Sequence, residues 1–388
     1  MANDIMSVKA EVSSILQLHA DERHMALALA LGRRELGRTW PNPAVGAVVV
    51  AETEQGPMIV GRGWTQAGGR PHAETEALRR AGAAARGATL YVTLEPCSHH
   101  GKTPPCADAI IGAGVARVVS ALEDPNPEVR GAGHARLAAH GIAVEVGVGA
   151  DAARRDHAGH IRRITSHRPH VTLKLAISAD GKAGLAGRRP VPITGAPATA
   201  RVHLMRASND AIMIGIGTAV ADDPSLTCRL PGMESRSPVR VVLDGALRLP
   251  LTSRLVATAH ATPLWVVTTA AAPFPREHAL RQHGVEVLRA PADAAAADRI
   301  DLAAALQLLA SRGITRLMVE GGPILAAALL ADDLVDEAAL FRSPHLLGGG
   351  AIDALDGLRL TALTQSATLA ARGSERVGLD RMELFARA

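Results

Sequence analysis

Two short segments of this chain combine residue types that bind a transition metal. His72 and Glu74 stand at the start of an expected helix, whereas Cys97 follows an expected strand and is separated from Cys106 by eight residues. Zinc with three protein ligands keeps a fourth position open for water and lowers the pKa of that water to about 7. Because the ligands must converge on one point, the fold has to bring a helix start to the end of a strand. Layered α/β sheets do this at the carboxyl ends of their strands.

These residue types are the components of a hydrolytic zinc deaminase, in which a glutamate that is not a ligand moves the protons. We therefore predict zinc ligation by His72, Cys97 and Cys106, with Glu74 as the proton carrier. Each part alone means little, because His-Ala-Glu triplets are common and two cysteines at this spacing can be inert core thiols. Their joint occurrence, with a proline before each cysteine and suitable elements around them, favours the metal site.

The histidines between the two cysteines leave alternatives open. His99 and His100 are rival metal ligands, although a Cys97–His99 ligand pair would be crowded. They are also candidates for contacts with substrate or phosphate, and equally for ordinary surface residues. The long spacer departs from the two residues that usually separate the cysteines of zinc deaminases.

Composition narrows the class of protein. The chain has 388 residues, 47% hydrophobic and 21% charged, which indicates a globular protein of about two domains. It has three Trp, one Tyr and three Phe, whereas proteins that bind single-stranded nucleic acids stack bases on aromatic side chains. The net charge of +4 includes no long run of Lys or Arg. It fits an ordinary solvated surface, or a preference for small anions such as phosphates.

Cysteine content and hydropathy bear on location. Three cysteines are too few for a disulfide framework, and two of them belong to the metal motif and must stay reduced, which predicts a cytoplasmic protein. The third, Cys228, is interpreted as an inert thiol. We expect no secretory signal and no membrane partner, because no apolar stretch is long enough to span a bilayer.

Hydrophobic patterning predicts two consecutive α/β domains. Residues 1–20 are expected to be a loose leader, and a helix is expected to open at Asp21. The boundary is placed at the basic segment that ends at Arg168, which gives domains at 21–167 and 168–388. In the first domain strands are expected at 45–50, 58–63, 89–94, 115–121 and 142–148, and helices at 72–80 and 133–140. In the second, strands are expected at 171–177, 211–214, 239–243, 264–268, 314–319 and 337–341, and helices at 199–208 and 323–331.

Two glycine clusters follow buried strands of the second domain. They are Gly215-Ile216-Gly217-Thr218 and Glu320-Gly321-Gly322-Pro323. Glycine lets backbone amides approach a phosphate closely, and the start of a helix favours an anion. Neither cluster has the G-x-G-x-x-G pattern, and either one alone is more typical of a tight turn.

Longer motifs resemble one known family. They are Thr39–Gly46 (TWPNPAVG), Pro71–Glu74 (PHAE), Thr93–Cys106 (TLEPCSHHGKTPPC) and Asp124–Pro127 (DPNP). Together they resemble the bifunctional riboflavin-biosynthesis pyrimidine deaminase/reductases, over nearly the whole chain from residue 21 onward. The block between the two cysteines is the most specific part of the resemblance.

The resemblance implies that the first domain is a cytidine-deaminase-like α/β/α sandwich that holds zinc on the three predicted ligands. Glu74 would carry protons while a phosphoribosylamino-diaminopyrimidine loses an amino group as ammonia. Asn42 would hold the pyrimidine, and His99 and Lys102 would lie along the substrate. Trp40 stands where the family usually has a histidine, so the rim of the pocket is expected to differ.

For the second domain the resemblance implies a dihydrofolate-reductase-like α/β fold that uses NADPH to reduce the ribosyl chain of the deaminated product to a ribityl chain. The implied cofactor contacts are Ala176, Thr194, Thr218, Asp222, Gly321 and Gly322, and the implied substrate contacts are Arg206, Leu226, Arg229 and Glu320. The two arginines are phosphate candidates, because guanidinium binds phosphate in a bidentate manner. Lys174 and Asp180 are candidates to polarise or protonate the sugar carbonyl, with Lys174 preferred, or else to form a structural pair.

One departure from the family concerns the cofactor. The family usually has an aromatic residue just before Ile193 and Thr194, where this chain has Pro192, which neither stacks nor donates a backbone hydrogen bond. This difference bears on the affinity for NADPH. Arg188 and Arg189 are candidates to compensate by binding the ribose phosphate of the cofactor.

The expected partner is a small phosphorylated pyrimidine rather than a nucleic acid, and reductases of this type resemble homo-oligomers formed through the second domain. Three alternatives stay open: a nucleic-acid deaminase with an appended domain, a regulator with a structural zinc, and a deaminase whose second domain only binds. The long cysteine spacer and the few aromatic residues argue against the first. Glu74 argues against the second, since a structural zinc needs no proton carrier.

Overall fold

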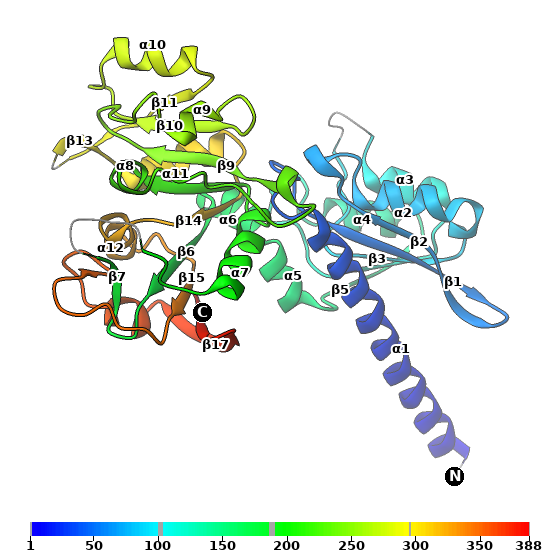
Figure 1. Ribbon diagram of the computed structural model, residues 1–388. Coiled ribbons are helices and arrows are strands. Elements are labelled where there is room, and N and C mark those ends of the chain that lie inside the picture. Colours follow the sequence, from blue (N-terminus) through cyan, green and yellow to red (C-terminus); the bar gives the residue numbers. More distant parts are fainter. Residues whose placement is uncertain (1, 100–103, 186–190, 295, 388) are drawn as a thin grey trace. The chain divides into compact units, whose positions relative to one another are not determined.

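The structure, a computed structural model, describes residues 2–99, 104–185, 191–294 and 296–387. It divides into two compact units, Met1–Thr165 and Ser166–Ala388, called unit 1 and unit 2 below. Both are α/β folds (Figure 1). The boundary expected from the sequence, after residue 167, lies beside this division.

Unit 1 is built on one five-stranded sheet. Its strands are β1 (Gly46–Thr53), β2 (Gly56–Trp64), β3 (Thr89–Val92), β4 (Arg117–Ser120) and β5 (Ala143–Val146). Its helices are α1 (Ala2–Gly32), α2 (Ala73–Ala81), α3 (Cys106–Ala113), α4 (Ala132–Ala139), α5 (Ala150–Asp156) and α6 (Ala158–Ser166), with short 3₁₀ turns η1 (Arg33–Glu35), η2 (Ala67–Gly69) and η3 (Gly82–Ala85). The strand order is β2-β1-β3-β4-β5, in which β1 runs antiparallel to both neighbours and β3, β4 and β5 run parallel. One buried apolar cluster joins the sheet to its helices.

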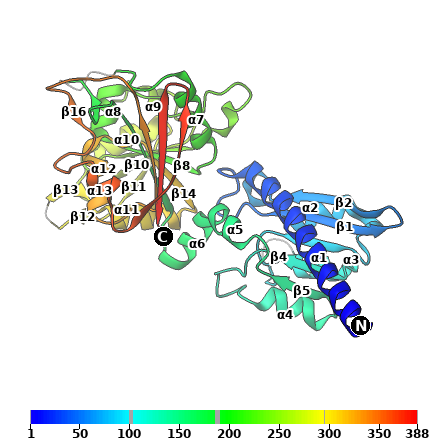
Figure 2. The same ribbon diagram turned by 90° about the horizontal axis from the view of Figure 1, so that it is seen from below.

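Glycines let two helices of unit 1 lie directly on the sheet. A Cβ atom on Gly63 would stand 2.0 Å from the carbonyl oxygen of Ala73 in α2. A Cβ atom on Gly46 would stand 1.8 Å from the carbonyl oxygen of Ala28 in α1. Gly63 pairs with Ala47, the neighbour of Gly46, and successive strand residues point to opposite faces. Therefore α1 and α2 cover opposite faces of the sheet, and α1 crosses it in Figure 2.

Gly63→Ala is expected to lower the free energy of unfolding of unit 1 by about 1–3 kcal/mol, because the new methyl group meets helix backbone rather than a movable side chain. Chemical denaturation measures the change. Gly112→Ala in α3 is the matched control, since no heavy atom lies within 4 Å of the position that its methyl group would take, and alanine favours a helix. Equal denaturation midpoints for the two variants would contradict the close approach of α2 to β2.

The prediction of a loose leader at residues 1–20 is wrong, because α1 runs without a break from Ala2 to Gly32. No glycine or proline interrupts this stretch before Gly32, so nothing in it ends the helix. Asp21 does not open the helix; it lies inside it, is 1% exposed, and accepts hydrogen bonds from Arg117 (2.9 and 2.7 Å) and Tyr91 (2.6 Å). Among the described residues, no helix is both long and apolar enough to cross a membrane.

Unit 2 is built on a nine-stranded sheet. Its strands, including those of the β12–β13 hairpin and of the separate β7–β16 pair, are β6 (His170–Ile177), β7 (Lys182–Gly184), β8 (Ala211–Gly215), β9 (Val239–Leu243), β10 (Leu264–Thr268), β11 (Glu286–Arg289), β12 (Ala292–Asp293), β13 (Ala296–Ile300), β14 (Arg316–Val319), β15 (Glu337–Arg342), β16 (Ile352–Asp353), β17 (Leu369–Val377) and β18 (Asp380–Arg387). Its helices are α7 (Ala196–Ala207), α8 (Ile216–Asp222), α9 (Arg254–Ala257), α10 (Phe274–Gln282), α11 (Leu302–Ser311), α12 (Pro323–Ala331) and α13 (Thr361–Thr364), with the 3₁₀ turn η5 (Glu234–Arg236).

The strand order of unit 2 creates a ligand crevice. The order is β11-β10-β9-β8-β14-β6-β15-β18-β17, parallel from β11 to β15 and antiparallel from there on. From β6 the chain moves past one position to β8 and outward to β11, and β14 later fills the position between β6 and β8. Ligands of open α/β sheets bind where the strand order switches in this way, outside the carboxyl ends of the strands.

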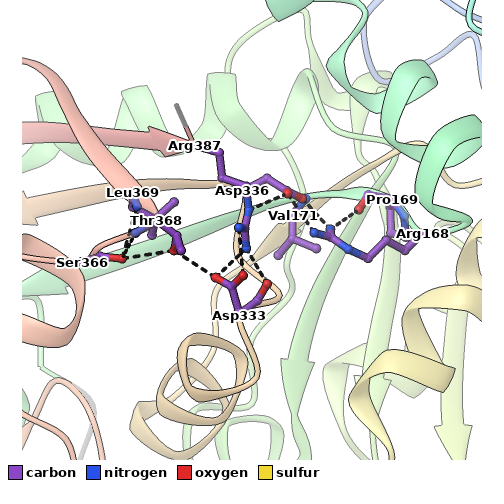
Figure 3. A network of polar contacts seen from close by, with 9 residues as sticks. All are labelled: Arg168, Pro169, Val171, Asp333, Asp336, Ser366, Thr368, Leu369 and Arg387. Atoms are coloured by element: carbon purple, nitrogen blue, oxygen red, sulfur yellow. Dashed lines mark hydrogen bonds and ion pairs between the residues drawn. The ribbon is translucent and has the colours of Figure 1, made fainter.

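At the amino ends of β6 and β15, away from the carboxyl ends of the parallel strands, a polar network connects the strands of this sheet (Figure 3). Both oxygens of Asp336, which is 2% exposed, accept hydrogen bonds from Arg168 at 2.6 and 2.9 Å, and one also accepts the backbone N–H of Val171. Arg387, in the last strand, is ion-paired with Asp336 and with Asp333. The network therefore joins the first strand of unit 2 to its last one.

Candidate functional site

Three side chains from separate parts of unit 1 converge on one point. His72 directly precedes α2, Cys97 follows β3, and Cys106 begins α3. Their ligand atoms all lie within 4.8 Å of one another, with Nδ1 of His72 3.3 Å from Sγ of Cys106 and 3.7 Å from Sγ of Cys97. Tetrahedral zinc, with Zn–N and Zn–S bonds of about 2.0 and 2.3 Å, would hold nitrogen and sulfur about 3.5 Å apart. The donor set therefore fits zinc.

The protonation of the two thiols also suits a cation. Hydrogen bonds from Cys106 and His72 lower the pKa of Cys97 to about 4, and the backbone N–H of Cys106 donates to the same sulfur at 3.3 Å. The contact with Cys97, together with burial, raises the pKa of Cys106. The cluster thus offers one ready thiolate, and a bound cation would favour deprotonation of the second thiol.

Glu74 lies beside this cluster in the first turn of α2 and is 4% exposed. Burial raises the pKa of Glu74. The charge of His72 lowers this pKa, whereas the charge of Cys97 raises it further. The carboxyl is also hydrogen-bonded with Cys106. A carboxyl group whose pKa lies above its usual range is suited to take up and release a proton near neutral pH.

The other residues predicted for this site are only partly placed. Nδ2 of Asn42 donates to the carbonyl oxygen of Gly69 at 2.8 Å, which ties the Asn42 loop to the segment that leads into His72. His99 is exposed. His100 and Lys102 lie outside the described residues.

A second cluster of metal-binding residue types in unit 1 does not fit a metal. It consists of Glu95, Glu123 and His134. Both oxygens of Glu95 already accept backbone hydrogen bonds, from Asp124 and Gly131 on one and from Gly133 and His134 on the other, at 2.9–3.2 Å. Since these donors occupy the carboxylate, Glu95 organises the loop rather than a cation.

Unit 2 contains a cavity of about 1350 Å³ along the carboxyl ends of its parallel strands. Most residues predicted for the second site line it: Lys174, Ala176, Thr194, Arg206, Thr218, Asp222, Leu226, Glu320, Gly321 and Gly322. Asp180 and Arg229 are not among the lining residues. The two glycine clusters, which are far apart in the sequence, therefore belong to one cavity.

Three charged side chains, those of Arg206, Glu320 and Lys174, line one part of the cavity. Arg206 donates from Nε and Nη2 to the two carboxylate oxygens of Glu320 at 2.6 and 2.8 Å. Burial alone would raise the pKa of Glu320, but Arg206 holds it below its usual value, so the carboxylate is ionised. Burial lowers the pKa of Lys174, with Glu320 opposing the shift. A desolvated amine beside an anion is suited to donate a proton to a substrate oxygen.

The glycine clusters leave room for a phosphate. A Cβ atom on Gly322 would stand 2.8 Å from Oγ1 of Thr218, so any side chain there would fill the space between α8 and α12. Gly322 caps α12, a helix of nine residues that begins at Pro323. The start of such a helix presents free backbone N–H groups to an anion. The residues present therefore fit the pyrophosphate of a dinucleotide.

The hydrogen bonds of Asp180 favour a structural role over a role in proton transfer to the sugar. The hydroxyl of Ser178 (2.6 Å) and the backbone N–H groups of Leu347 and Gly348 (3.1 and 2.8 Å) donate to its carboxylate. These hydrogen bonds, that of Ser178 first, lower the pKa of Asp180 to about 2. A carboxylate so engaged holds two loops together, which leaves Lys174 as the candidate proton donor.

The segment with the unusual proline contributes apolar contacts. Val191 and Ile193 line the cavity together with Thr194, whereas Pro192 does not. Arg188 and Arg189, predicted to compensate for the missing aromatic residue, lie outside the described residues. The apolar side chains on either side of Pro192 thus contribute to the cavity wall, while Pro192 itself does not.

Sequence reasoning missed one wall of the cavity. It is formed by Gly245, Arg248 and the hairpin of β12 and β13, including Asp298 and Arg299. The hairpin packs so closely that a Cβ atom on Gly245 would stand 2.0 Å from the carbonyl oxygen of Asp298. A glycine two positions after the buried strand β9 was the available signal, but its partner lies 53 positions away in the chain.

Comparison with known families agrees with this division of sites. Residues 18–122 match the model of the cytidine and deoxycytidylate deaminase zinc-binding region. Residues 169–380 match the model of the RibD C-terminal domain. The predicted fold class, a cytidine-deaminase-like domain followed by an α/β reductase domain, is confirmed.

Similar proteins cover nearly the whole chain. It is 41% identical to the riboflavin biosynthesis protein RibD of Escherichia coli K12 over 85% of this chain and 89% of that protein, and 38% identical to that of Aquifex aeolicus over 95% and 98%. Among solved structures, Acinetobacter baumannii RibD superposes with a TM-score of 0.84 at 34% identity, covering 96% of this chain and 99% of that one. A diaminohydroxyphosphoribosylaminopyrimidine deaminase/5-amino-6-(5-phosphoribosylamino)uracil reductase from Thermotoga maritima gives 0.81 at 34% identity, covering 96% and 100%. This chain belongs to the RibD family of bifunctional deaminase/reductases of riboflavin biosynthesis, whose cofactors are zinc and NADPH.

Proposed function

We propose that unit 1 deaminates the phosphoribosylamino-diaminopyrimidine and that unit 2 reduces the ribosyl chain of the product. His72, Cys97 and Cys106 hold the zinc, and Glu74 moves the protons. The observation that carries the first half is the convergence of the three ligand atoms beside a buried carboxyl group. The second half is supported by the large cavity that joins Lys174 and the two glycine clusters.

In unit 1, some residues bind the metal and the substrate, and Glu74 transfers protons. Zinc, when bound, lowers the pKa of a water molecule and so supplies the nucleophile. Glu74 accepts one proton of the water and passes it to the ring nitrogen of the pyrimidine, and it then carries the second proton of the same oxygen to the departing amino group, so that ammonia leaves and a carbonyl remains. Glu74 is 4% exposed, so little bulk water reaches its carboxyl group. Asn42, fixed to the segment before His72, orients the ring.

In unit 2, the residues hold the sugar and supply a proton. NADPH supplies the hydride. Lys174 hydrogen-bonds to the ring oxygen of the ribose and protonates it as the bond between that oxygen and C1′ breaks, which leaves C1′ bonded to the amino nitrogen and open to reduction. Glu320, held by Arg206, keeps the ammonium of Lys174 charged until that step. Arg229, which is exposed, is the better of the two phosphate candidates, because Arg206 is already bidentate with a carboxylate.

A coupled assay with the phosphoribosylamino-diaminopyrimidine tests the proposal by following ammonia release and NADPH oxidation separately. We expect both, with NADPH oxidation after ammonia release. Lys174→Met is expected to lower NADPH oxidation by about 10²–10⁴-fold, the usual contribution of general acid catalysis, and to leave ammonia release unchanged. Ammonia without NADPH oxidation in the unmodified protein would support the alternative that the second domain only binds.

We further propose a cytoplasmic enzyme that acts on a small phosphorylated pyrimidine and assembles as a homo-oligomer through unit 2. The support for the location is chemical, since the ligand thiols have to stay reduced to bind the metal. The few aromatic residues support a small substrate over a nucleic acid. Light scattering of the purified protein tests the oligomer, and a steep dependence of RNA binding on salt would count against the small substrate.

A further inference from the structure

Two side chains of helix α7 form hydrogen bonds with the backbone of the loop that follows α8. Nη1 of Arg206 donates to the carbonyl oxygen of Thr227 at 3.0 Å. One turn earlier in α7, Nδ1 of His203 accepts the backbone N–H of Arg229 at 3.3 Å. The loop is held from the other side by Ser237, whose hydroxyl accepts the backbone N–H of Cys228 at 3.1 Å. Each of three successive loop residues therefore has a backbone anchor.

The backbone of this loop is strained where it meets the cavity. Leu226 has a φ of +55° although it is not a glycine, and it is 3% exposed and lines the cavity of unit 2. A non-glycine residue in this region of φ is strained and persists only where the surroundings hold it. The anchors on α7 supply that constraint, because they fix the residues directly after Leu226.

Charged groups from three segments face His203, which is itself 6% exposed. Arg206 lies on α7, Arg229 on the loop, and Glu320 follows β14. Burial, and then the charges of Arg206 and Arg229, lower the pKa of His203, with Glu320 and the carbonyl of Thr227 opposing. The imidazole is therefore neutral at pH 7 and offers one nitrogen as a hydrogen-bond acceptor.

We propose that His203 is a positioning residue of the reductase site: it accepts the backbone N–H of Arg229 and so holds the strained loop that presents Leu226 to the sugar and Arg229 to the substrate phosphate. This inference rests on the reductase activity proposed for unit 2. A protonated His203 has no acceptor nitrogen and adds a third positive charge beside the two arginines, so the anchor is lost in acid.

The test compares His203→Ala and His203→Asn with the unmodified protein, as full chains loaded with zinc and saturated with NADPH, from pH 5.5 to 8. For the deaminated substrate, His203→Ala is expected to raise KM about tenfold with little change in kcat, as for one lost hydrogen bond to a partly buried donor. His203→Asn is expected to restore the low KM, because Oδ1 of asparagine stands where Nδ1 of histidine does. Exposed His278→Ala in α10 is the matched control.

The pH profile separates positioning from a merely structural role. The substrate phosphate titrates near pH 6 in every variant, so only the difference between variants is informative. KM of the unmodified protein is expected to rise more steeply in acid than that of His203→Asn, which carries no titrating group there. Ammonia release and the thermal midpoint are expected to stay unchanged in both variants.

A binding measurement keeps this result independent of hydride transfer. Titration of the NADP⁺-saturated protein with ribose 5-phosphate, followed by calorimetry, is expected to show about tenfold weaker binding in His203→Ala and no loss in His203→Asn. The proposal is overturned if His203→Ala binds as tightly as the unmodified protein, or if His203→Asn is as defective as His203→Ala. An unmodified protein that binds ribose 5-phosphate but oxidises no NADPH would contradict the reductase activity while leaving the anchor standing.

Discussion

Glu74→Gln is expected to abolish ammonia release by this protein while zinc stays bound. The amide has nearly the shape of the carboxyl group, so the buried site beside Cys106 is filled as before. It cannot, however, take a proton from water or return one to the leaving amine. General acid–base catalysis contributes about 10²–10⁴-fold, and we expect a loss of at least this size in kcat. Zinc content by mass spectrometry and ammonia release by a coupled assay are the two measurements.

The matched control for this variant is Glu76→Gln, two residues further along α2. Glu76 forms ion pairs with Arg79 and Arg80 in the same helix, and we place it outside the proton-transfer machinery. Its ammonia release is therefore expected to match that of the unmodified protein. If Glu74→Gln retained turnover with a full complement of zinc, the role of Glu74 would be refuted. If it lost zinc as well, the effect would be assigned to the metal site.

Asp336→Asn is expected to lower the free energy of unfolding of unit 2 by about 3–5 kcal/mol, the cost of breaking a buried ion pair by removing one partner. The substitution leaves Arg168, whose side chain is 12% exposed, facing an amide, and it weakens the contact with Arg387. Figure 3 shows how these side chains meet between the first and last strands of the unit. Trp265 in β10 reports unfolding of unit 2 by fluorescence in a Trp40→Phe/Trp64→Phe background.

Exposed Asp353 provides the control for this substitution. Its ion pair with Lys182 is 2.7 Å long but its side chain is 70% exposed, so Asp353→Asn is expected to cost less than about 1 kcal/mol. Similar losses for the two variants would contradict the importance of burial in the Asp336 network.

The stabilising effect of Asp336 also has a defined pH dependence. Burial alone would raise the pKa of Asp336, but Arg168 and its neighbours hold it below the usual value. Because the folded value is lower than the unfolded value of about 3.9, the stabilisation is complete above that pH. It is lost as the pH falls toward the folded value, so the difference between Asp336→Asn and the unmodified protein is expected to shrink there.

Elements with a strong periodic pattern can be predicted from the sequence. The strands of the parallel sheet, such as 239–243 and 264–268, are predicted at their observed bounds, because buried strands leave continuous apolar runs. The first twenty residues lack an apolar pattern, which suggests a loose leader, yet a stretch without glycine or proline continues the helix. The β12–β13 hairpin escapes prediction, since its few residues carry no periodicity.

The metal site can be predicted because its residues lie in two local motifs with a specific spacing. The anchor on His203 cannot, because nothing local distinguishes a histidine inside α7 from an ordinary core residue. Its partner is a backbone N–H group 26 positions away, which has no side-chain signature. Asp180 is a related case, because its backbone hydrogen-bond donors come from a loop more than 160 positions later.

By itself, the sequence was enough to predict the ligand set of His72, Cys97 and Cys106, the proton carrier Glu74 and the residue types of the reductase site, because these residues lie in short motifs. Only the tertiary structure decided how distant charges are paired: Arg206 with Glu320, Arg168 with Asp336, and His203 with the loop of Arg229. The physical reason is that hydrophobic periodicity specifies an element and its buried face, whereas the order of strands specifies which polar groups meet at its ends. That order results from packing of the whole sheet and leaves no trace in any single segment.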